Sequence, residues 1–403
     1  MPRFPSLILA AVFITSLGLA TASADIYVSN SGAPSMTVYS DSAQGDAAPI
    51  RTLQGPDTNL GTTGGLALDL VHGELFLVPH STSETVNVYP RDADGNQAPI
   101  RSLEGANTGL SWATALAVDP VNNELYVTDF DNHSIRVFSR TADGNVAPIR
   151  VIEGPNTRLE YPVGIFVDLV NDELFVTSPL TESVSVFSRT ASGDVEPLRI
   201  LEGPSTLLGN SQWVFVSLEH DELYVSNRGG SISVYPRTAD GDVAPVRRIR
   251  GSNTMIDFPQ GIVLTADDEL ILGNEESDTI LVFPRLADGD VAPSRSIVGA
   301  ATGLDGPYGL ASTRAAEGSV GYAGPLPIFS DGFESGDTSA WSLTVPYSHD
   351  QLVSEPPLVP DPLTYSAHLA QPAPSHDLVL HEVLITRRGK QQPRPSGWCA
   401  FRT

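Results

Sequence analysis

Several side chains that could bind a ligand or a metal ion stand in short polar segments, each of which follows an apolar stretch. Carboxylates, imidazoles and amides from several segments could hold a divalent cation, and aromatic rings with an arginine could bind a polar ligand. The candidates are His80, Trp112, Asp129, Asp131, His133, Tyr161, Trp213, Arg228, Asn274, Glu275 and Glu276. Whether they form one site depends on the elements that position them.

Those elements recur along the chain every 48 to 50 residues. Each copy contains an Ala-Pro or Glu-Pro step followed two residues later by an arginine. The prolines are Pro49, Pro99, Pro148, Pro197, Pro245 and Pro293. A period of this length, built from strand-like pieces, predicts an all-β fold, a β-propeller with four-stranded blades.

Within one copy, the predicted strands are residues 115–119, 124–128, 134–138 and 147–152. The first is almost wholly apolar, which suits an inner strand that is buried on both sides. The later pieces alternate like half-buried strands. An Asp-Gly pair between the third and fourth strands predicts a tight hairpin turn, and the proline places the fourth strand at the outer edge.

The two ends of the repetitive region complement each other. A single inner strand near Gly309 follows the last full copy, while the segment from Asp25 to Leu53 supplies three strand-like pieces. Together they make one blade. We therefore expect six blades, with the ring closed by N-terminal strands that also protect otherwise open sheet edges.

The second copy carries a family resemblance. Residues 125–138 resemble an NHL repeat at Asp129, Asn132, His133, Ile135, Val137 and Phe138, and His80 and Asn274 are aligned with Asp129 in their own copies. Over about residues 25–312, the chain is similar to exported bacterial six-bladed propellers of the NHL type. This resemblance implies the fold and leaves the activity open, because that family includes interaction modules, lyases and sugar-lactone hydrolases.

In such a propeller, the loops between the second and third strands and the links between blades emerge on one face, where the candidate residues would gather. Asp129 and His133 also match the repeat pattern, so holding a turn together is the simpler role for them. A lactonase-type cation site would need acidic or imidazole groups at the mouths of the inner strands. Small or neutral residues stand there instead: Gly64, Gly65, Thr114, Gly164, Gln212, Gln260 and Gly309.

Two further sequence patterns could bind an ion. The segment from Asp92 to Asn96 resembles the start of a calcium loop, but it lacks a closing acidic residue and its Asp-Gly recurs in other copies, which favours a turn. The arginine of each fourth strand could bind an anion only if several shared one surface. We expect these arginines to pair with nearby carboxylates such as Glu104, Glu153 or Glu202.

The ends and the charge of the chain indicate its location. A basic start, an apolar run and the Ala-x-Ala site before Asp25 predict a cleaved signal peptide at residues 1–24, and therefore a secreted or periplasmic protein. Residues 313–327 have the composition of a linker, residues 328–342 resemble a short C-terminal motif of exported bacterial proteins, and the Pro-rich residues 343–403 are expected to be a disordered tail. Cys399 is the single cysteine and cannot form an internal disulfide.

The net charge of −25 disfavours nucleic acid and anionic lipid as partners, and no segment is apolar enough to span a bilayer. We expect a monomeric, non-enzymatic scaffold without a cofactor that binds a protein or carbohydrate partner through one loop face. The alternative is a lyase or lactone hydrolase that uses Ca²⁺ or Mg²⁺ at the channel mouth, with His80, His133, Glu275 and Glu276 as its residues.

Overall fold

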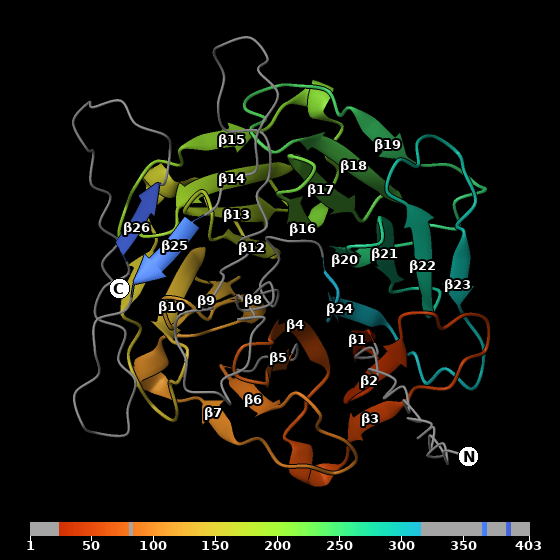
Figure 1. Ribbon diagram of the computed structural model, residues 1–403, viewed down its shortest axis with the longest axis horizontal. Coiled ribbons are helices and arrows are strands. Elements are labelled where there is room, and N and C mark those ends of the chain that lie inside the picture. The colour runs from red at the N-terminus through yellow and green to blue at the C-terminus, as the bar shows by residue number, and fades with distance from the viewer. Residues whose placement is uncertain (1–23, 80–83, 316–364, 369–383, 388–403) are drawn as a thin grey trace, which may run out of the picture. The chain divides into compact units, whose positions relative to one another are not determined.

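The computed structural model describes residues 24–79, 84–315, 365–368 and 384–387 (Figure 1). The chain forms two compact units, Met1–Ala323 and Gly324–Thr403. The described part of the second unit is one antiparallel pair, β25 (Tyr365–His368) and β26 (Leu384–Arg387). All of the predicted signal peptide except Ala24, most of the linker, the 328–342 motif and most of the tail lie outside the described residues, as does His80.

The first unit consists of six four-stranded antiparallel sheets arranged as a ring. Blade 1 contains β4 (Thr63–Asp69), β5 (Glu74–Pro79), β6 (Val86–Pro90) and β7 (Arg101–Leu103); blade 2 contains β8 (Ala113–Asp119), β9 (Glu124–Asp129), β10 (Ser134–Ser139) and β11 (Arg150–Ile152). Blade 3 contains β12 (Ile165–Asp168), β13 (Glu173–Ser178), β14 (Ser183–Ser188) and β15 (Arg199–Leu201); blade 4 contains β16 (Ser211–Ser217), β17 (Glu222–Asn227), β18 (Ser231–Pro236) and β19 (Arg247–Ile249). Blade 5 contains β20 (Pro259–Leu264), β21 (Glu269–Asn274), β22 (Thr279–Pro284) and β23 (Arg295–Ile297); blade 6 contains β24 (Pro307–Ser312), β1 (Asp25–Asn30), β2 (Ser35–Ser40) and β3 (Arg51–Gln54).

Blade 6 closes the ring from both ends of the repetitive region. Its strand order is β24-β1-β2-β3, and Val28 of β1 is opposite Leu310 of β24. The predicted six-bladed propeller with N-terminal closure is confirmed. In Figure 1 the inner strands β4, β8, β12, β16, β20 and β24 surround the centre, and neighbouring inner strands are in contact.

The inner strands approach one another too closely for ordinary side chains at some points. A Cβ atom on Gly164 would lie 2.5 Å from the carbonyl oxygen of Gln212 in the next blade. The hydroxyl of Thr177 donates to that same carbonyl at 2.7 Å, and Thr128 and Ser226 make the equivalent bonds to Val163 and Gln260. The glycines at the inner-strand mouths therefore have a packing role.

Short connections follow most outer strands. Blades 1 to 4 are each preceded by a 3-10 turn, and these turns are η1 (Pro56–Thr58), η2 (Ala106–Thr108), η3 (Pro155–Thr157) and η4 (Pro204–Thr206). Each has a glycine with positive φ immediately before it, such as Gly154 at 125°. In the part of the chain that the structure describes, no helix is long and apolar enough to cross a membrane.

The outer strands are shorter than predicted. β11 begins at Arg150, so the predicted strand 147–152 is wrong at its start, and Pro148 lies before the strand. Proline has no N–H to donate to the ladder, and the first ladder-like bond comes from the N–H of Ile149 to the oxygen of Val137 at 2.7 Å. The same shift places Pro49 before β3, which begins at Arg51.

The Asp-Gly segment connects blades, whereas the sequence predicted a tight hairpin turn within one blade. Gly144 has φ of 67° and donates its N–H to Ser102 of the preceding blade at 2.8 Å. The neighbouring Asn145 accepts the N–H of Asn107 at 2.7 Å, which caps the start of η2. We call this contact the latch. The backbone part of the latch recurs at every junction between blades. It forms parallel bridges between Gly45 and Ile297, Leu53 and Gly95, Leu103 and Gly144, Ile152 and Gly193, Leu201 and Gly241, and Ile249 and Gly289.

Ion pairs gather at the end of the ring where the second strands begin, which we call the ion-pair face. Arg150 binds both carboxylate oxygens of Glu124, at 2.5 and 2.9 Å, so the expected pairing with Glu104, Glu153 or Glu202 is wrong. The partner is the glutamate opposite the arginine in the same blade, two strands away. The equivalent pairs are Arg51 with Asp25, Arg101 with Glu74, Arg199 with Glu173, Arg247 with Glu222 and Arg295 with Glu269.

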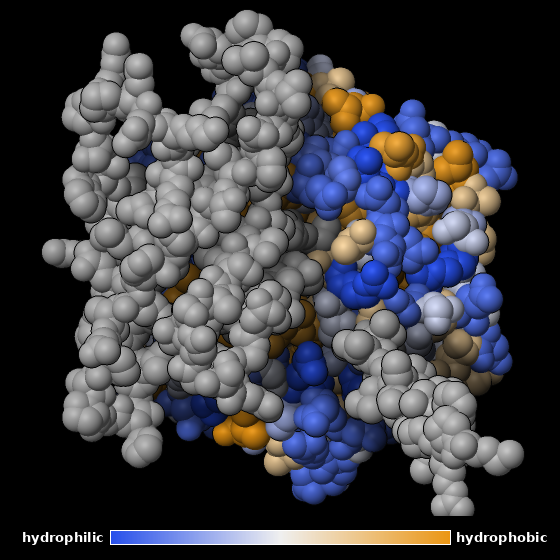
Figure 2. Space-filling view, in the orientation of Figure 1, coloured by the Kyte–Doolittle hydropathy of each residue, from blue (hydrophilic) through white to orange (hydrophobic). Residues whose placement is uncertain are grey.

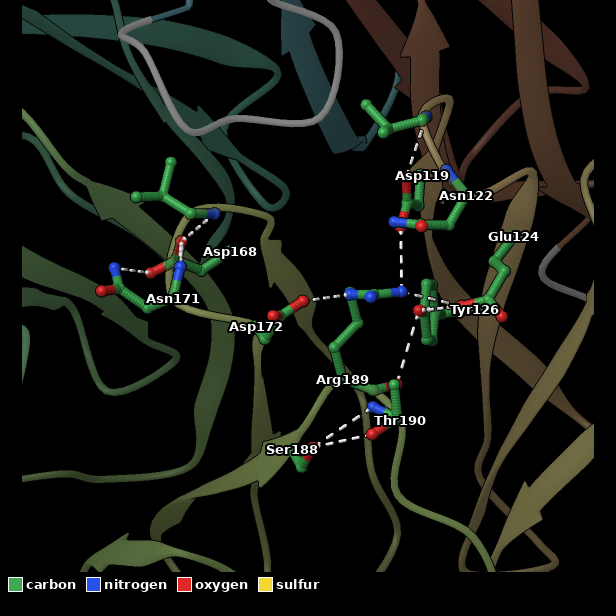
Figure 3. Close-up of polar contacts among 12 residues, drawn as sticks. Asp119, Asn122, Glu124, Tyr126, Asp168, Asn171, Asp172, Ser188, Arg189 and Thr190 are labelled. Atoms are coloured by element: carbon green, nitrogen blue, oxygen red, sulfur yellow. Dashed lines mark hydrogen bonds and ion pairs between the residues drawn. The ribbon is translucent and has the colours of Figure 1, made fainter. Parts of the chain in front are cut away.

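A second arginine reaches Glu124 from the next blade. Figure 3 shows the guanidinium of Arg189, in blade 3, between Asp119 and Glu124 of blade 2 and Asp172 of its own blade. Its nitrogens lie 3.3 Å from both blade 2 carboxylates and 2.7 Å from Asp172. Burial alone would raise the pKa of Glu124, but hydrogen bonds from Arg150 and Tyr126 and the charge of Arg189 hold that pKa below its ordinary value.

Candidate functional site

The opposite end of the ring, which we call the loop face, carries the candidate residues. It is formed by the loops between second and third strands and by the connections between blades. Antiparallel strands bring these segments to one end, because each blade passes through four strands before the chain enters the next. The candidates fall into two groups, one at the junction of blades 2 and 3 and one around blades 4 to 6.

The first group is a row of half-buried rings, which we call the aromatic row: Trp112, Phe130, Tyr161 and His133. The ring centroids of Trp112 and Phe130 are 5.0 Å apart, those of Phe130 and Tyr161 4.8 Å, and those of His133 and Tyr161 4.2 Å. The N–H of Tyr161 donates to Nδ1 of His133 at 3.1 Å. Sequence reasoning missed Phe130, although a large aromatic residue inside a polar loop is itself a signal.

A cavity of about 550 Å³ lies beside this row. His133, Glu160 and Tyr161 line it, together with Gly154 and Pro155 of the connection to blade 3. His133 and Tyr161 have φ of 51° and 53°, but Glu182 and Asp278 share the conformation of His133 in their own blades. Asn210 and Phe258 share the conformation of Tyr161 in the same way, so both left-handed positions recur in other blades and are not a special strain at this site.

Asp129 organises the loop beneath the aromatic row. Its fully buried carboxylate accepts the N–H groups of Ser111 and Trp112, at 3.2 and 3.1 Å, and the Nε–H of Arg136 at 2.8 Å. Asn132 donates to it at 2.7 Å. With these four donors, both oxygens are already engaged in holding the turn. Asp131, two residues later, is exposed and has no hydrogen bond or ion pair within the described residues.

Asn274 holds the equivalent turn in blade 5, because its side chain accepts from the N–H of Asp257 at 3.2 Å and donates to Met255 at 2.8 Å. In blade 1, Pro79 is opposite Thr63 as Asp129 is opposite Ala113. The alignment of His80 with Asp129 is therefore wrong by one position.

The second group surrounds the channel mouth. The rings of Trp213 from blade 4 and Tyr308 from blade 6 meet edge to face at 5.3 Å. Burial, and then the charge of Glu275, raise the pKa of Tyr308. Glu275 accepts a hydrogen bond from Nε2 of Gln260 at 2.5 Å and lies 3.6 Å from Arg228, whose guanidinium stacks over Phe258. Glu276 is exposed.

The residues of the cation-dependent alternative do not come together. His133 belongs to blade 2 and Glu275 and Glu276 to blade 5, three blades apart in a ring of six, and His80 lies outside the described residues. Within the described ranges, no three His, Cys, Asp or Glu side chains are grouped so that they could hold a metal ion. In the segment that resembles a calcium loop, Asp94 and Asn96 accept the N–H groups of Thr52 and Asp57.

Comparison with known proteins agrees with this geometry. The NHL repeat family matches residues 110–138, the region that holds Asp129 and His133. No curated protein matches the chain. Among solved structures, a chain from a nidogen/laminin complex is similar with a TM-score of 0.51 and 14% identity, over 72% of this chain and 98% of that one. The WD40 β-propeller domain of Doa1 is similar with a TM-score of 0.45 and 13% identity, over 69% and 80%.

These findings define the class of protein as a β-propeller. More specifically, the chain is an NHL-like propeller of six four-stranded blades.

Proposed function

We propose that the protein is a non-catalytic binding scaffold whose loop face holds a protein or carbohydrate partner. The observation that carries this proposal is the contrast between a repetitive framework and a loop face that differs from blade to blade. Strands buried on both sides fix the bases of the loops, so the binding groups lose little conformational entropy when a partner is bound.

The aromatic row supports a binding role. Its rings are large and have few rotatable bonds, and they lie against one another at a surface junction, as residues that dominate binding interfaces commonly do. The part of the propeller surface that Figure 2 leaves visible is mostly hydrophilic, with scattered apolar residues. Large exposed apolar side chains such as Val121 and Val170, each 76% exposed, belong to the turns of the ion-pair face.

The engagement of the carboxylates disfavours the hydrolase or lyase alternative. A general base must be able to accept a proton from a substrate. Asp129 already accepts four hydrogen bonds, and Glu275 is held by Gln260 and Arg228.

A chain from a nidogen/laminin complex shares the fold, so the architecture is compatible with protein recognition. The amino-terminal sequence and the negative charge support an exported protein that does not bind nucleic acid. We further propose that it acts as a monomer.

The test compares capture of a partner from exported material by the full chain and by two variants. Phe130→Ala with Tyr161→Ala removes half of the aromatic row, whereas Val121→Ser with Val170→Ser changes exposed residues on the ion-pair face. We expect the first variant to lose the partner and the second to keep it. Equal capture by both variants would overturn the proposed face.

A glycan array and a mass-spectrometric identification separate a carbohydrate partner from a protein one. Turnover of a lactone or polysaccharide substrate that requires Ca²⁺ or Mg²⁺ and stops with chelator would replace the scaffold proposal with the enzyme alternative.

A further inference from the structure

A second groove on the loop face, between blades 3 and 4, has a charge opposite to that of the protein. Its volume is about 620 Å³, within the usual range for small-ligand sites. It is lined by Thr181 and Glu182 of blade 3, by the connection that includes Leu207, and by Arg248 and Arg250 of blade 4. None of these residues was a candidate from the sequence.

Both arginines depart from the repeat. The position of Arg248 is occupied in the other outer strands by Thr52, Ser102, Val151, Ile200 and Ser296, and the position of Arg250 by Gln54, Glu104, Glu153, Glu202 and Val298. Neither position carries a cationic residue in any other blade, and three of the residues equivalent to Arg250 are acidic. Blade 4 therefore carries two extra positive charges at a junction where its neighbours are neutral or negative.

Neither arginine forms an ion pair with any carboxylate that the structure describes. Nη2 of Arg248 donates to Ser231 at 3.2 Å, but its buried Nε has no hydrogen-bond partner among the described residues. Burial, followed by the charge of Arg250, lowers the pKa of Arg248 from its ordinary value. The same unpartnered Nε occurs in Arg51, Arg101, Arg150, Arg199 and Arg247, so the feature peculiar to blade 4 is that two arginines line the groove and neither has, within the described ranges, a carboxylate, the partner that guanidinium groups strongly prefer.

The loop beside the groove is also unusual. Blade 4 joins its second and third strands through residues 228–230, one residue fewer than the 130–133 loop of blade 2, and two of the three residues are glycines. Gly229 lines the groove, and no atom lies within 4 Å of the place its Cβ would take. The shorter loop therefore places no side chain at Gly229, where it borders the groove.

We propose that this groove binds an oxyanion group, a carboxylate or a sulfate or phosphate ester, carried by the ligand of the loop face. The inference rests on the proposed binding function and assigns to it the chemistry of one subsite. The planar guanidinium of Arg248 donates two parallel hydrogen bonds to the oxyanion, and Arg250 adds charge at the exposed side. Glu182 also lines the groove and pairs with neither arginine, so its negative charge disfavours a dianion.

The experiment measures binding of inorganic phosphate, sulfate, glucuronate and glucose to the full chain by calorimetry. Glucose and glucuronate differ only in the carboxylate, and the phosphate and sulfate arms report the ester chemistries. We expect saturable binding of at least one anion, no binding of glucose, and weaker binding at high salt because exposed charge pairs are screened.

Two substitutions restore the residues that other blades carry: Arg248→Ser, as in Ser102, and Arg250→Glu, as in Glu104. We expect this double variant to fold normally and to lose anion affinity at least tenfold. The matched control, Arg158→Gln, removes an exposed arginine at the previous junction and should change affinity less than twofold. Equal affinity in the double variant and the wild-type chain, or no saturable binding of any of the three anions, would overturn the inference.

The failure of this inference is distinguishable from the failure of the proposed function. If the anion site is wrong, the Arg248→Ser, Arg250→Glu variant binds the probes as the wild-type chain does, while the aromatic-row variant still loses its partner. If the binding function is wrong, the aromatic-row variant retains everything that the wild-type chain captures.

Discussion

The two ends of the propeller treat their charged residues in opposite ways. On the ion-pair face, the same glutamate and arginine recur in blade after blade and neutralise one another, as Glu124 does with Arg150 and Arg189. On the loop face, the charged and aromatic residues change with each blade, and several, such as Asp131, Glu276 and Arg250, have no charged partner in the described part of the chain. The ion-pair face therefore stabilises the ring, and the residues of the loop face are free to differ from blade to blade.

Acidification should have the largest effect, because it acts on every ion pair of the ring at once. The folded-state pKa values of Glu74, Glu124 and Glu222 are all held below the ordinary value by hydrogen bonds and charges from arginines, against a raising effect of burial. A carboxylate with a depressed folded pKa stabilises the fold above its unfolded pKa, and this stability is lost as pH falls through the folded pKa. We expect the melting temperature to be nearly constant between pH 8 and 6 and to fall steeply below about pH 4.5.

A melting temperature that stayed level down to pH 3 would show that these glutamates do not stabilise the ring. Titration with salt at pH 7 provides a control, because partly buried pairs are screened less than exposed ones.

Removal of Arg189 should have the next largest effect. The variant Arg189→Ala leaves the fully buried carboxylate of Asp119 without this charge and breaks the link from blade 3 to Glu124. We expect the free energy of unfolding to fall by about 3 kcal/mol, a cost typical of breaking a buried pair. Urea denaturation measures it.

The matched control for that experiment is Arg158→Ala, at an exposed pair with Glu202 on the loop-face side of the same junction. Half of the Arg158 side chain is exposed, so its loss should change the free energy of unfolding by less than about 0.5 kcal/mol. Similar losses for the two arginines would contradict the idea that only one end secures the ring.

The latch should contribute less than an ion-pair network. Asn145→Ala removes the side-chain cap on the N–H of Asn107 in the preceding connection. We expect a loss of about 1 kcal/mol, the usual cost of removing a cap of this kind. Asp131→Ala, in the same blade and without a partner among the described residues, should be neutral within about 0.5 kcal/mol. A neutral Asn145→Ala would mean that the backbone bonds of Gly144 suffice.

The sequence predicted the framework well because the framework is repetitive. The spacing of Pro49 to Pro293 and the single inner strand at Gly309 were sufficient to predict six blades and their closure. Contacts between blades could not be predicted in the same way, since a repeat shows which residues are equivalent and not which copies touch. Arg189, which reaches Asp119 and Glu124 of the preceding blade, is such a contact. Within one blade, the recurring arginines were expected to pair with carboxylates such as Glu104, Glu153 or Glu202, whereas Arg150 binds Glu124 two strands away.

The groove residues escaped prediction for a different reason. Arg248 and Arg250 closely follow the recurring arginine Arg247 and depart from the repeat only in comparison with the equivalent positions of the other outer strands. The row formed by Trp112, Phe130 and Tyr161 likewise depends on which blade connection lies beside which loop. Aromatic residues that are 31 positions apart in the chain become neighbours only through the packing of blades 2 and 3.

The last pair of variants tests the comparison most directly, because it applies one chemical change to both faces. Glu124→Gln removes a carboxylate that two arginines share and should cost about 2 kcal/mol, in the range for hydrogen bonds to charged groups. Glu276→Gln removes an exposed carboxylate that has no partner within the described residues and should change the free energy of unfolding by less than about 0.5 kcal/mol. Equal losses would show that both faces stabilise the ring, whereas a neutral Glu276→Gln that alters partner capture would place this glutamate in binding, where its lack of an internal partner is an advantage.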